Sequence, residues 1–337
     1  MISRLLLCSL FLTSVASAVE VSLISQNVWF ILTASVPAMD RIPDYIAEFR
    51  SGTYDILCLQ EVWSGTQTTY PDLLFEGLKE VYPYNVSTEP RPLTGLNLGL
   101  DSGLMILSKY PIESFAFHQY GNSSGIDAFS GKGAMTAHIK VPDDDGSTRD
   151  LIVSNTHLNA GGPLEIRLNQ AREMRNSIDR FLKNLEETEG LDIDKVPVFG
   201  LGDFNTDEWN DELTEVQEGY QQLLGVLGPT TKDIFRSLYP PDVEVGLTTS
   251  SSRIDFVFGL SGEYTVVSAG VDGFVQTANP AFRLSDHLGA HATVKLEPLS
   301  ANGGASSTES SDSSMFGLCW STMSLLFLFS SHLMTYA

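Results

Sequence analysis

The sequence predicts a layered α/β domain between residues 19 and 298. Short apolar runs alternate with segments whose apolar residues recur every three or four positions. Several runs are apolar throughout, which is typical of strands covered on both faces of a sheet. We predict strands at residues 21–28, 55–62, 103–109, 133–141, 150–158, 196–204, 253–259 and 289–296.

The clearest predicted helix begins after Pro163, because proline suits the start of a helix. Apolar residues then follow at helical spacing, namely Leu164, Leu168, Ala171, Met174, Ile178, Phe181 and Leu185. We expect two further helices at residues 38–49 and 70–81. No internal repeat or linker interrupts this alternation, so we expect a single domain.

The chain is strongly acidic, with 20 basic residues against 42 acidic ones and a formal net charge of -22. Such a surface repels nucleic-acid phosphates and disfavours nonspecific nucleic-acid binding, although a local basic groove can coexist with it. No protein partner can be inferred from the sequence.

The first 18 residues are typical of a signal peptide. Arg4 precedes an apolar run at residues 5–15, and Ala16-Ser17-Ala18 forms a small-residue cleavage pattern. We therefore expect the protein to enter the secretory pathway.

The C-terminal segment is typical of a glycosylphosphatidylinositol (GPI) anchor signal. Residues 299–314 form a small, polar spacer, and residues 315–337 are apolar without any Lys, Arg, Asp or Glu. Asn302 is the first candidate for the attachment site, with Ser306 and Ser310 as alternatives. The pattern predicts a place on the outer leaflet of the cell surface; a C-terminal transmembrane helix is the alternative.

Cys58 is the one cysteine between the two end segments, and its apolar run predicts a buried thiol. Two sequons, at Asn85 and Asn122, are candidate glycosylation sites in an exported protein.

Polar residues gather where the predicted strands end or begin, where they can converge on a cleft above a sheet. Each is ordinary alone: a Gly-Asp-Phe-Asn stretch is a common turn, for example. Asp255 is less ordinary, because a carboxylate among apolar neighbours requires a partner. The set comprises Asn27, Glu61, His157, Asp203, Asn205, Asp255, Asp286 and His287.

Together these residues indicate metal-assisted hydrolysis of a phosphoester. Oxygen ligands such as Glu61 and Asn27 suit a hard divalent cation, Mg²⁺ first and Mn²⁺ as the alternative. Histidines beside carboxylates suit general acid and base chemistry, and no nucleophilic Ser or Cys is required.

The motifs "QNVW", "LQEVW", "NTHL", "GDFN", "RIDFVF" and "LSDH" occur in an order that resembles the DNase I-like endonuclease/exonuclease/phosphatase superfamily. The resemblance covers nearly all of the chain between the two end segments. It implies an α/β four-layer sandwich, in which two packed mixed β-sheets are flanked by helices.

The resemblance also implies roles at the metal. Glu61 corresponds to the principal metal ligand, and Asn27 to a second contributor at the metal and the substrate phosphate. His287 corresponds to the base that takes a proton from the attacking water. Asp286 would orient His287 or serve a second metal position.

The remaining implied roles concern the phosphate. Asp203 and Asn205 correspond to the pair that positions the water and holds the phosphoryl oxygens. His157 would donate to the developing charge, and Asp255 would hold His157 by a hydrogen bond.

The segments "DSGLMILSKYPI" and "IDAFSGKGAMTAHI" resemble the neutral sphingomyelinases within the superfamily. That branch hydrolyses sphingomyelin to ceramide and phosphocholine, which implies a membrane sphingolipid as the substrate. Aromatic faces attract the quaternary ammonium of such a substrate, so Trp29 and Trp63 are candidate contacts, with core packing as the alternative.

Lys132 stands between two glycines but does not form a nucleotide-binding loop, because Gly133 follows it and the next residues alternate like a strand. We expect Lys132 either to contact the lipid phosphate or a lipid-facing loop, or to be a solvated loop residue. A secreted nuclease of the same fold and a catalytically inactive surface protein are the competing functions.

Overall fold

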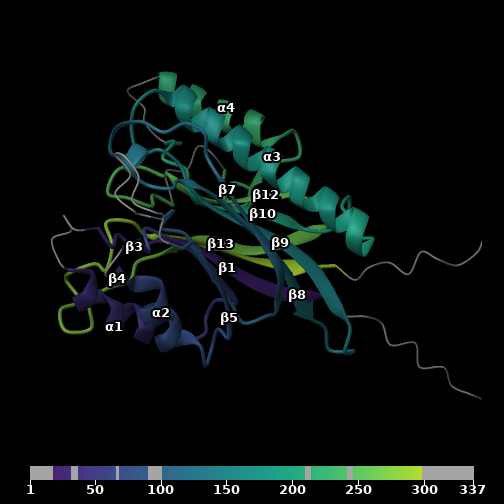
Figure 1. Cartoon of the computed structure of the whole chain (residues 1–337), viewed down its shortest axis with the longest axis horizontal. Coiled ribbons are helices and arrows are strands. Elements are labelled where there is room, and N and C mark those ends of the chain that lie inside the picture. Colours follow the sequence, from purple (N-terminus) through teal and green to yellow (C-terminus); the bar gives the residue numbers. More distant parts are fainter. Residues whose placement is uncertain are drawn as a thin grey trace, which may run out of the picture. The chain divides into compact units, whose positions relative to one another are not determined.

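The computed structural model describes residues 18–31, 37–65, 68–89, 101–208, 214–240 and 246–297 (Figure 1). The predicted spacer, apolar tail and Asn302 lie outside these residues, as does the predicted signal peptide apart from Ala18. Within the described part of the chain, every helix is too short or too polar to cross a membrane.

The first sheet is mixed and has six strands in the order β13-β14-β1-β2-β6-β5. Its central pair, β1 and β2, is parallel, and every other neighbouring pair is antiparallel. Its strands are β1 (Val19–Asn27), β2 (Ile56–Gln60), β5 (Tyr84–Ser87), β6 (Met105–Ser108), β13 (Tyr264–Asp272) and β14 (Gly289–Leu296).

The second sheet is also mixed and six-stranded, in the order β11-β12-β10-β9-β8-β7. Here β9 and β10 form the parallel pair. Its strands are β7 (Ile112–Gln119), β8 (Gly133–Pro142), β9 (Thr148–His157), β10 (Val198–Asp203), β11 (Lys232–Asp233) and β12 (Asp255–Ser261).

Helices cover the outer face of each sheet, as Figure 1 shows, so the four predicted layers are confirmed. Helices α1 (Ala38–Phe49) and α2 (Tyr70–Leu78) pack on the first sheet, and α3 (Leu164–Glu189) and α4 (Thr214–Leu227) pack on the second. A short 3₁₀ helix, η1 (Gly125–Phe129), and a small hairpin of β3 (Ser64–Gly65) and β4 (Thr68–Thr69) complete the elements.

Helix α2 ends at Leu78, three residues before the predicted end. The backbone N–H groups of Val81 and Tyr82 both bond to the Leu78 carbonyl, which closes the helix with a turn. Pro83 contributes to this end, because a proline disfavours helical backbone in the residue before it.

The apolar core lies in three parts, one between the two sheets and one under each helix pair. Both faces of β2 are therefore buried, which explains why this strand is apolar without alternation. Cys58 lies in the core between the sheets, so the predicted buried thiol is confirmed.

A buried polar pair links the two sheets at the ends of their strands. The Gln60 side-chain amide of β2 donates to Asn155 Oδ1 of β9 at 2.8 Å. Asn155 Nδ2 in turn donates to the Leu59 carbonyl at 2.8 Å and the Met105 carbonyl at 3.0 Å. Since both side chains are fully buried, these bonds fix how the sheets face each other at this end.

Replacing Asn155 by Ala should lower the free energy of unfolding by about 2 kcal/mol, because buried partners lose their hydrogen bonds. Urea denaturation measures the change. Asn184→Ala, on the exposed surface of α3, is the control and should change the free energy by less than about 0.5 kcal/mol. Equal effects of the two substitutions would contradict a linking role for Asn155.

Candidate active site

The ends of three neighbouring strands of the second sheet bring a histidine and two aspartates together. His157 ends β9, Asp203 ends β10 and Asp255 begins β12. Asp203 pairs in register with both of the others, so all three side chains lie on one face of the sheet.

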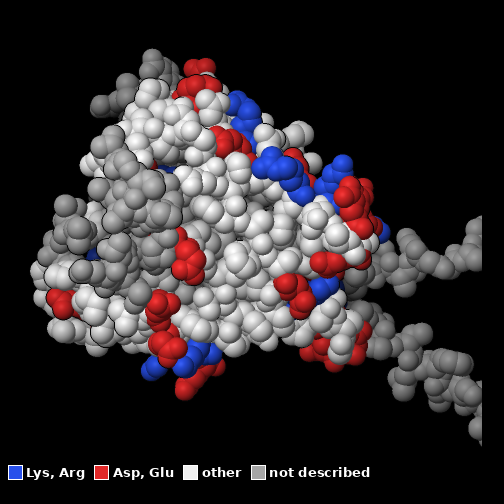
Figure 2. All heavy atoms as spheres, in the orientation of Figure 1, with Lys and Arg blue, Asp and Glu red and all other residues white. Residues whose placement is uncertain are grey.

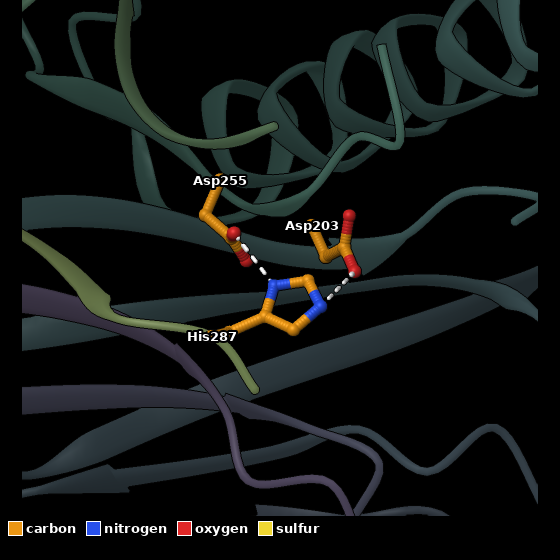
Figure 3. A group of neighbouring side chains, drawn as sticks. All are labelled: Asp203, Asp255 and His287. Carbon is orange, nitrogen blue, oxygen red and sulfur yellow. Dashed lines mark hydrogen bonds and ion pairs between the residues drawn. The ribbon is translucent and has the colours of Figure 1, made fainter. Parts of the chain in front are cut away.

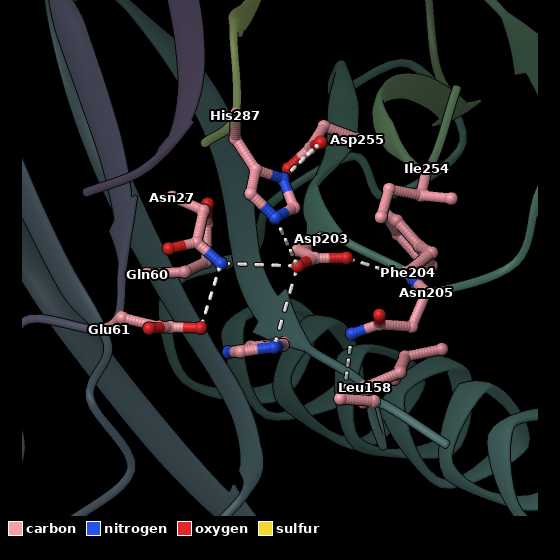
Figure 4. Close-up of polar contacts among 12 residues, drawn as sticks. Asn27, Gln60, Glu61, Leu158, Asp203, Phe204, Asn205, Ile254, Asp255 and His287 are labelled. Carbon is pink, nitrogen blue, oxygen red and sulfur yellow. Dashed lines mark hydrogen bonds and ion pairs between the residues drawn. The ribbon is translucent and has the colours of Figure 1, made fainter. Parts of the chain in front are cut away.

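Asp203 lies at the centre of the polar network in Figure 4. Its Oδ1 accepts a hydrogen bond from the backbone N–H of Asn205 at 2.9 Å, and its Oδ2 accepts one from Asn27 Nδ2 at 3.2 Å. The Nε2 atoms of His157 and His287 lie 3.5 and 3.8 Å from the same Oδ2. Asn27 comes from the first sheet, so this network spans both sheets.

Asp255 holds His287, as Figure 3 shows, through a 2.8 Å hydrogen bond between Nδ1 of the imidazole and Oδ2 of the carboxylate. The predicted bond from Asp255 to His157 is therefore wrong. Strand β10 lies between the strands that carry these two residues. Two strand spacings separate them by about 10 Å, while the loop before β14 brings His287 to the Asp255 side.

Three residues of the site have a left-handed backbone that non-glycine residues rarely adopt: Trp29 (φ 57°), Glu61 (φ 60°) and Asn205 (φ 48°). Each directly follows, or lies two residues beyond, the end of a strand that carries site residues. Such conformations persist only where the surroundings enforce them, and they concentrate at functional sites.

The carboxylate of Glu61 is suited to a divalent cation. Its Oε1 accepts a hydrogen bond from Asn27 Nδ2 at 3.1 Å, whereas its Oε2 is buried without a hydrogen-bond partner. A buried, unsatisfied carboxylate oxygen is costly unless a cation balances it. Carboxylate and amide oxygens are the donors that Mg²⁺ prefers, so the predicted ligands Glu61 and Asn27 fit the ion.

A second group of possible metal-binding atoms belongs to Asp203, Asp255 and His287, which each offer one within 4.8 Å of the others. Asp286 does not join it: its carboxylate is exposed, and Ser285 Oγ lies 3.3 Å from its Oδ1.

The chain matches the model of the endonuclease/exonuclease/phosphatase family over residues 24–287. The chain belongs to this family. All the predicted catalytic and metal-binding residues lie within the matched segment. A crystal structure of a Staphylococcus aureus beta toxin variant with bound magnesium ions has the same fold. That structure superposes with a TM-score of 0.55 at 19% identity over 81% of this chain and 99% of its own.

Two curated relatives are more specific. The human protein named sphingomyelin phosphodiesterase 3 is 29% identical over 168 residues, which is 48% of this chain and 25% of that protein. The inositol phosphosphingolipids phospholipase C of Schizosaccharomyces pombe is 28% identical over 162 residues, 44% of this chain and 33% of that protein. The aligned part of this chain thus spans a third or less of the length of these relatives.

The ionisable groups of the site strongly affect one another's pKa values. Burial opposes protonation of His287, but Asp255 and Asp203 outweigh it and raise the imidazole pKa to about 10. Burial and the neighbouring Asp255 raise the pKa of Asp203 to about 7. The site therefore holds a protonated His287 between two carboxyl groups, one of which titrates near neutrality.

The pKa shifts of His157 and Glu61 both favour the uncharged form of the side chain. Burial lowers the pKa of His157 well below its ordinary value, and the nearby charges of Lys132 and His287 add to this. Burial raises the pKa of Glu61, although the hydrogen bond from Asn27 opposes the shift. A bound cation would reverse the shift of Glu61.

Lys132 is not a solvated loop residue, since only 2% of it is exposed. Its Nζ donates to the Leu158 carbonyl at 2.9 Å and lies 3.2 Å from Asp127 Oδ1. The Leu158 carbonyl also accepts from Asn205 Nδ2 at 3.1 Å, which places Lys132 directly behind the site. A Cβ on the following residue, Gly133, would lie 2.3 Å from the His118 carbonyl, so glycine is required for this close approach of strands.

The other predicted residues lie around the site or apart from it. Trp29 and Trp63 are half-buried, and Trp63 packs against Gly103, where a Cβ would lie 3.0 Å from its ring. Asn122 is exposed, whereas Asn85 is half-buried in the edge strand β5. Contacts of Lys132 and the tryptophans with substrate, and glycosylation of the asparagines, stay predictions.

Arg41, a charged residue on the buried face of α1, was not predicted from the sequence. The spacing of Ala38, Arg41, Ile42 and Tyr45 places the arginine among core residues. A charge at an apolar position of an amphipathic helix is the signal that could have identified it.

Asp255→Asn should lower the pKa of His287 from about 10, because the amide keeps the hydrogen-bonding shape but removes the nearest negative charge. NMR titration of the imidazole in metal-free buffer measures it. The control is Asp286→Asn, a change at the exposed residue next to His287, which should shift the His287 pKa far less.

The same change affects stability. A raised pKa of His287 stabilises the wild-type fold fully below about 6.5, and this contribution disappears as the pH rises through 10. The Asp255→Asn variant should therefore lose less stability over this range than the wild type does. An unchanged pH dependence would show that Asp255 does not set the charge of His287.

Proposed function

We propose that this family member is a divalent-metal-dependent phosphodiesterase that hydrolyses sphingomyelin to ceramide and phosphocholine. The observation that carries the proposal is the convergence of Asn27, His157 and His287 on Asp203, beside the unpartnered Glu61 oxygen. The names of the human and fission-yeast relatives support a phosphosphingolipid as the substrate.

A divalent cation, Mg²⁺ or Mn²⁺, held by Glu61 and Asn27 would draw electron density from the phosphoryl group of the substrate. With a pKa of about 7, Asp203 is partly ionised near neutral pH, so its carboxylate, beside the protonated His287, is suited to accept a proton from the attacking water. Asp255 would keep Nδ1 of His287 bonded, which directs Nε2 to the reacting centre.

The remaining residues suit the phosphate and the leaving group. His157 and Asn205 flank Asp203 and can donate hydrogen bonds to oxygens whose negative charge increases in the transition state. Water supplies the oxygen added to phosphorus and the proton that ceramide carries away, so sphingomyelin and water balance ceramide and phosphocholine. No covalent enzyme intermediate is required.

The charge distribution favours a zwitterionic lipid over a nucleic acid. A nuclease needs basic side chains along its groove to bind the phosphate backbone. On the face shown in Figure 2, Lys and Arg lie mostly beside Asp and Glu. Along α3, for example, Arg175 pairs with Asp179 and Lys183 with Glu187.

The wild-type protein with Mg²⁺ should release phosphocholine from sphingomyelin vesicles, and chelation of the metal should abolish release. Glu61→Gln should raise the Mg²⁺ concentration needed for half-maximal activity by about tenfold or more, because the amide retains the bond from Asn27 but removes a ligand charge.

Glu173→Gln is the matched control, since Glu173 is also a partly buried carboxylate that accepts backbone and side-chain hydrogen bonds. Its metal requirement should match the wild type. Cleavage of plasmid DNA without turnover of sphingomyelin would favour the nuclease. Absence of any phosphodiester hydrolysis would favour the inactive surface protein.

Attachment to the outer leaflet by a GPI anchor is part of the proposal, because sphingomyelin would then be in reach of the site. Phosphatidylinositol-specific phospholipase C should release the full-length protein from intact cells, whereas an Asn302→Gln variant should not become attached in this way. Retention of the wild-type protein after treatment would favour a membrane-spanning tail, and attachment of the variant would favour Ser306 or Ser310.

A further inference from the structure

Arg41 of α1 is only 1% exposed, and its guanidinium group bonds to the backbone of two loops. It donates to the Val28 carbonyl at 2.9 Å and the Trp29 carbonyl at 2.6 Å. It also donates to the Leu284 carbonyl at 2.5 Å. One side chain thus connects two segments that lie far apart in the sequence.

Both loops carry residues of the active site. Val28 and Trp29 directly follow Asn27, which bonds to Glu61 and Asp203. Leu284 lies three residues before His287, which bonds to Asp255. Any movement of these carbonyls relative to Arg41 would change the position of Asn27 or of His287, whose side chains both reach Asp203.

A second contact joins the same two loops. The Ser285 hydroxyl donates to the Asn27 carbonyl at 2.7 Å and accepts a hydrogen bond from the His287 backbone N–H at 3.0 Å. The hydrogen bonds of Arg41 and Ser285 therefore connect residues 27–29 with residues 284–285. The left-handed conformation of Trp29 lies within the first of these segments, where an enforced geometry is needed to maintain it.

The buried charge of Arg41 has a large desolvation cost, and burial accordingly lowers its pKa. The rings of Trp29 and Phe30 lie 5.5 and 5.3 Å from the guanidinium carbon, which offsets part of this cost. An apolar residue would fill this position of α1 at lower cost. A buried arginine here thus points to a task that an apolar side chain cannot perform.

We propose that Arg41 is a positioning residue that fixes Asn27 and His287 at the separation from which both reach Asp203. This inference rests on the proposed metal-dependent hydrolysis for its effect on turnover, while the positioning itself is independent of the substrate. Arginine is required because its planar fork donates to several carbonyls at once. A lysine ammonium on a single stem does not reproduce this arrangement.

The test compares Arg41→Lys with the matched control Arg149→Lys. Arg149 is likewise buried and donates to a backbone carbonyl, that of Leu296, at 3.1 Å. It lies near the start of β9, eight residues before His157, and so about 26 Å along the strand from the site. Both variants exchange a buried guanidinium for an ammonium.

Three measurements on the full chain separate positioning from stability. Hydrogen–deuterium exchange should increase for peptides covering residues 27–31 and 284–288 in Arg41→Lys, with the rest of the chain unchanged. Calorimetric titration with Mg²⁺ alone should show about tenfold weaker binding, and kcat should fall about 10–100-fold, as a small misplacement of reacting groups produces. Arg149→Lys should show none of the three effects.

The proposal is overturned if exchange increases throughout the Arg41→Lys protein, or if its Mg²⁺ affinity equals that of Arg149→Lys. Should Arg41→Lys not fold, Arg41→Gln removes the buried charge and is measured in the same way. If neither folds, Arg41 is a core residue alone and the proposal fails. A wild-type protein that ignores sphingomyelin while Arg41→Lys still shows the local exchange and weaker Mg²⁺ binding would refute the proposed function but not the positioning.

Discussion

The face-to-face packing of two mixed sheets is the constraint on which the site depends. Asn27 ends a strand of the first sheet and Glu61 directly follows another, whereas His157, Asp203 and Asp255 come from the second sheet. The 3.2 Å contact between Asn27 and Asp203 exists only if the sheets keep one separation and one register. The apolar core between the sheets sets the separation, and the Gln60–Asn155 pair fixes the polar end.

This arrangement stores unfavourable free energy at the site. Two carboxyl groups and an imidazole are buried together, and three non-glycine residues adopt left-handed backbone. Each feature opposes folding, so the surrounding core and hydrogen bonds must over-determine the geometry. A site assembled in advance needs little reorganisation when charge moves during a reaction, which is the main electrostatic requirement of phosphoryl transfer.

The sequence predicted the buried strands and most of the site, since central strands must be apolar and polar residues at their ends stand out. It missed β7 and β13, which are edge strands with many exposed positions and therefore weak apolar patterns. The bond from Asp255 to His157 that the resemblance implied is replaced by one to His287, because strand order in a sheet is not written in the local sequence. Arg41 was missed because its importance depends on two loops that only the fold brings to α1.

Two buried cations near the site, Lys132 and Arg41, bond to backbone carbonyls and so leave the oxygens of Glu61 available. Lys132 bonds to the Leu158 carbonyl and Arg41 to the carbonyls of Val28, Trp29 and Leu284, while Glu61 contributes to the electrostatic environment of both cations. A cation that bonds to carbonyls offsets nearby negative charge without occupying the oxygens of Glu61. Its unpartnered Oε2 can then meet a divalent ion, whereas a direct salt bridge to either cation would have blocked it. The two cations therefore act on the site through hydrogen bonds to the backbone segments that carry its residues.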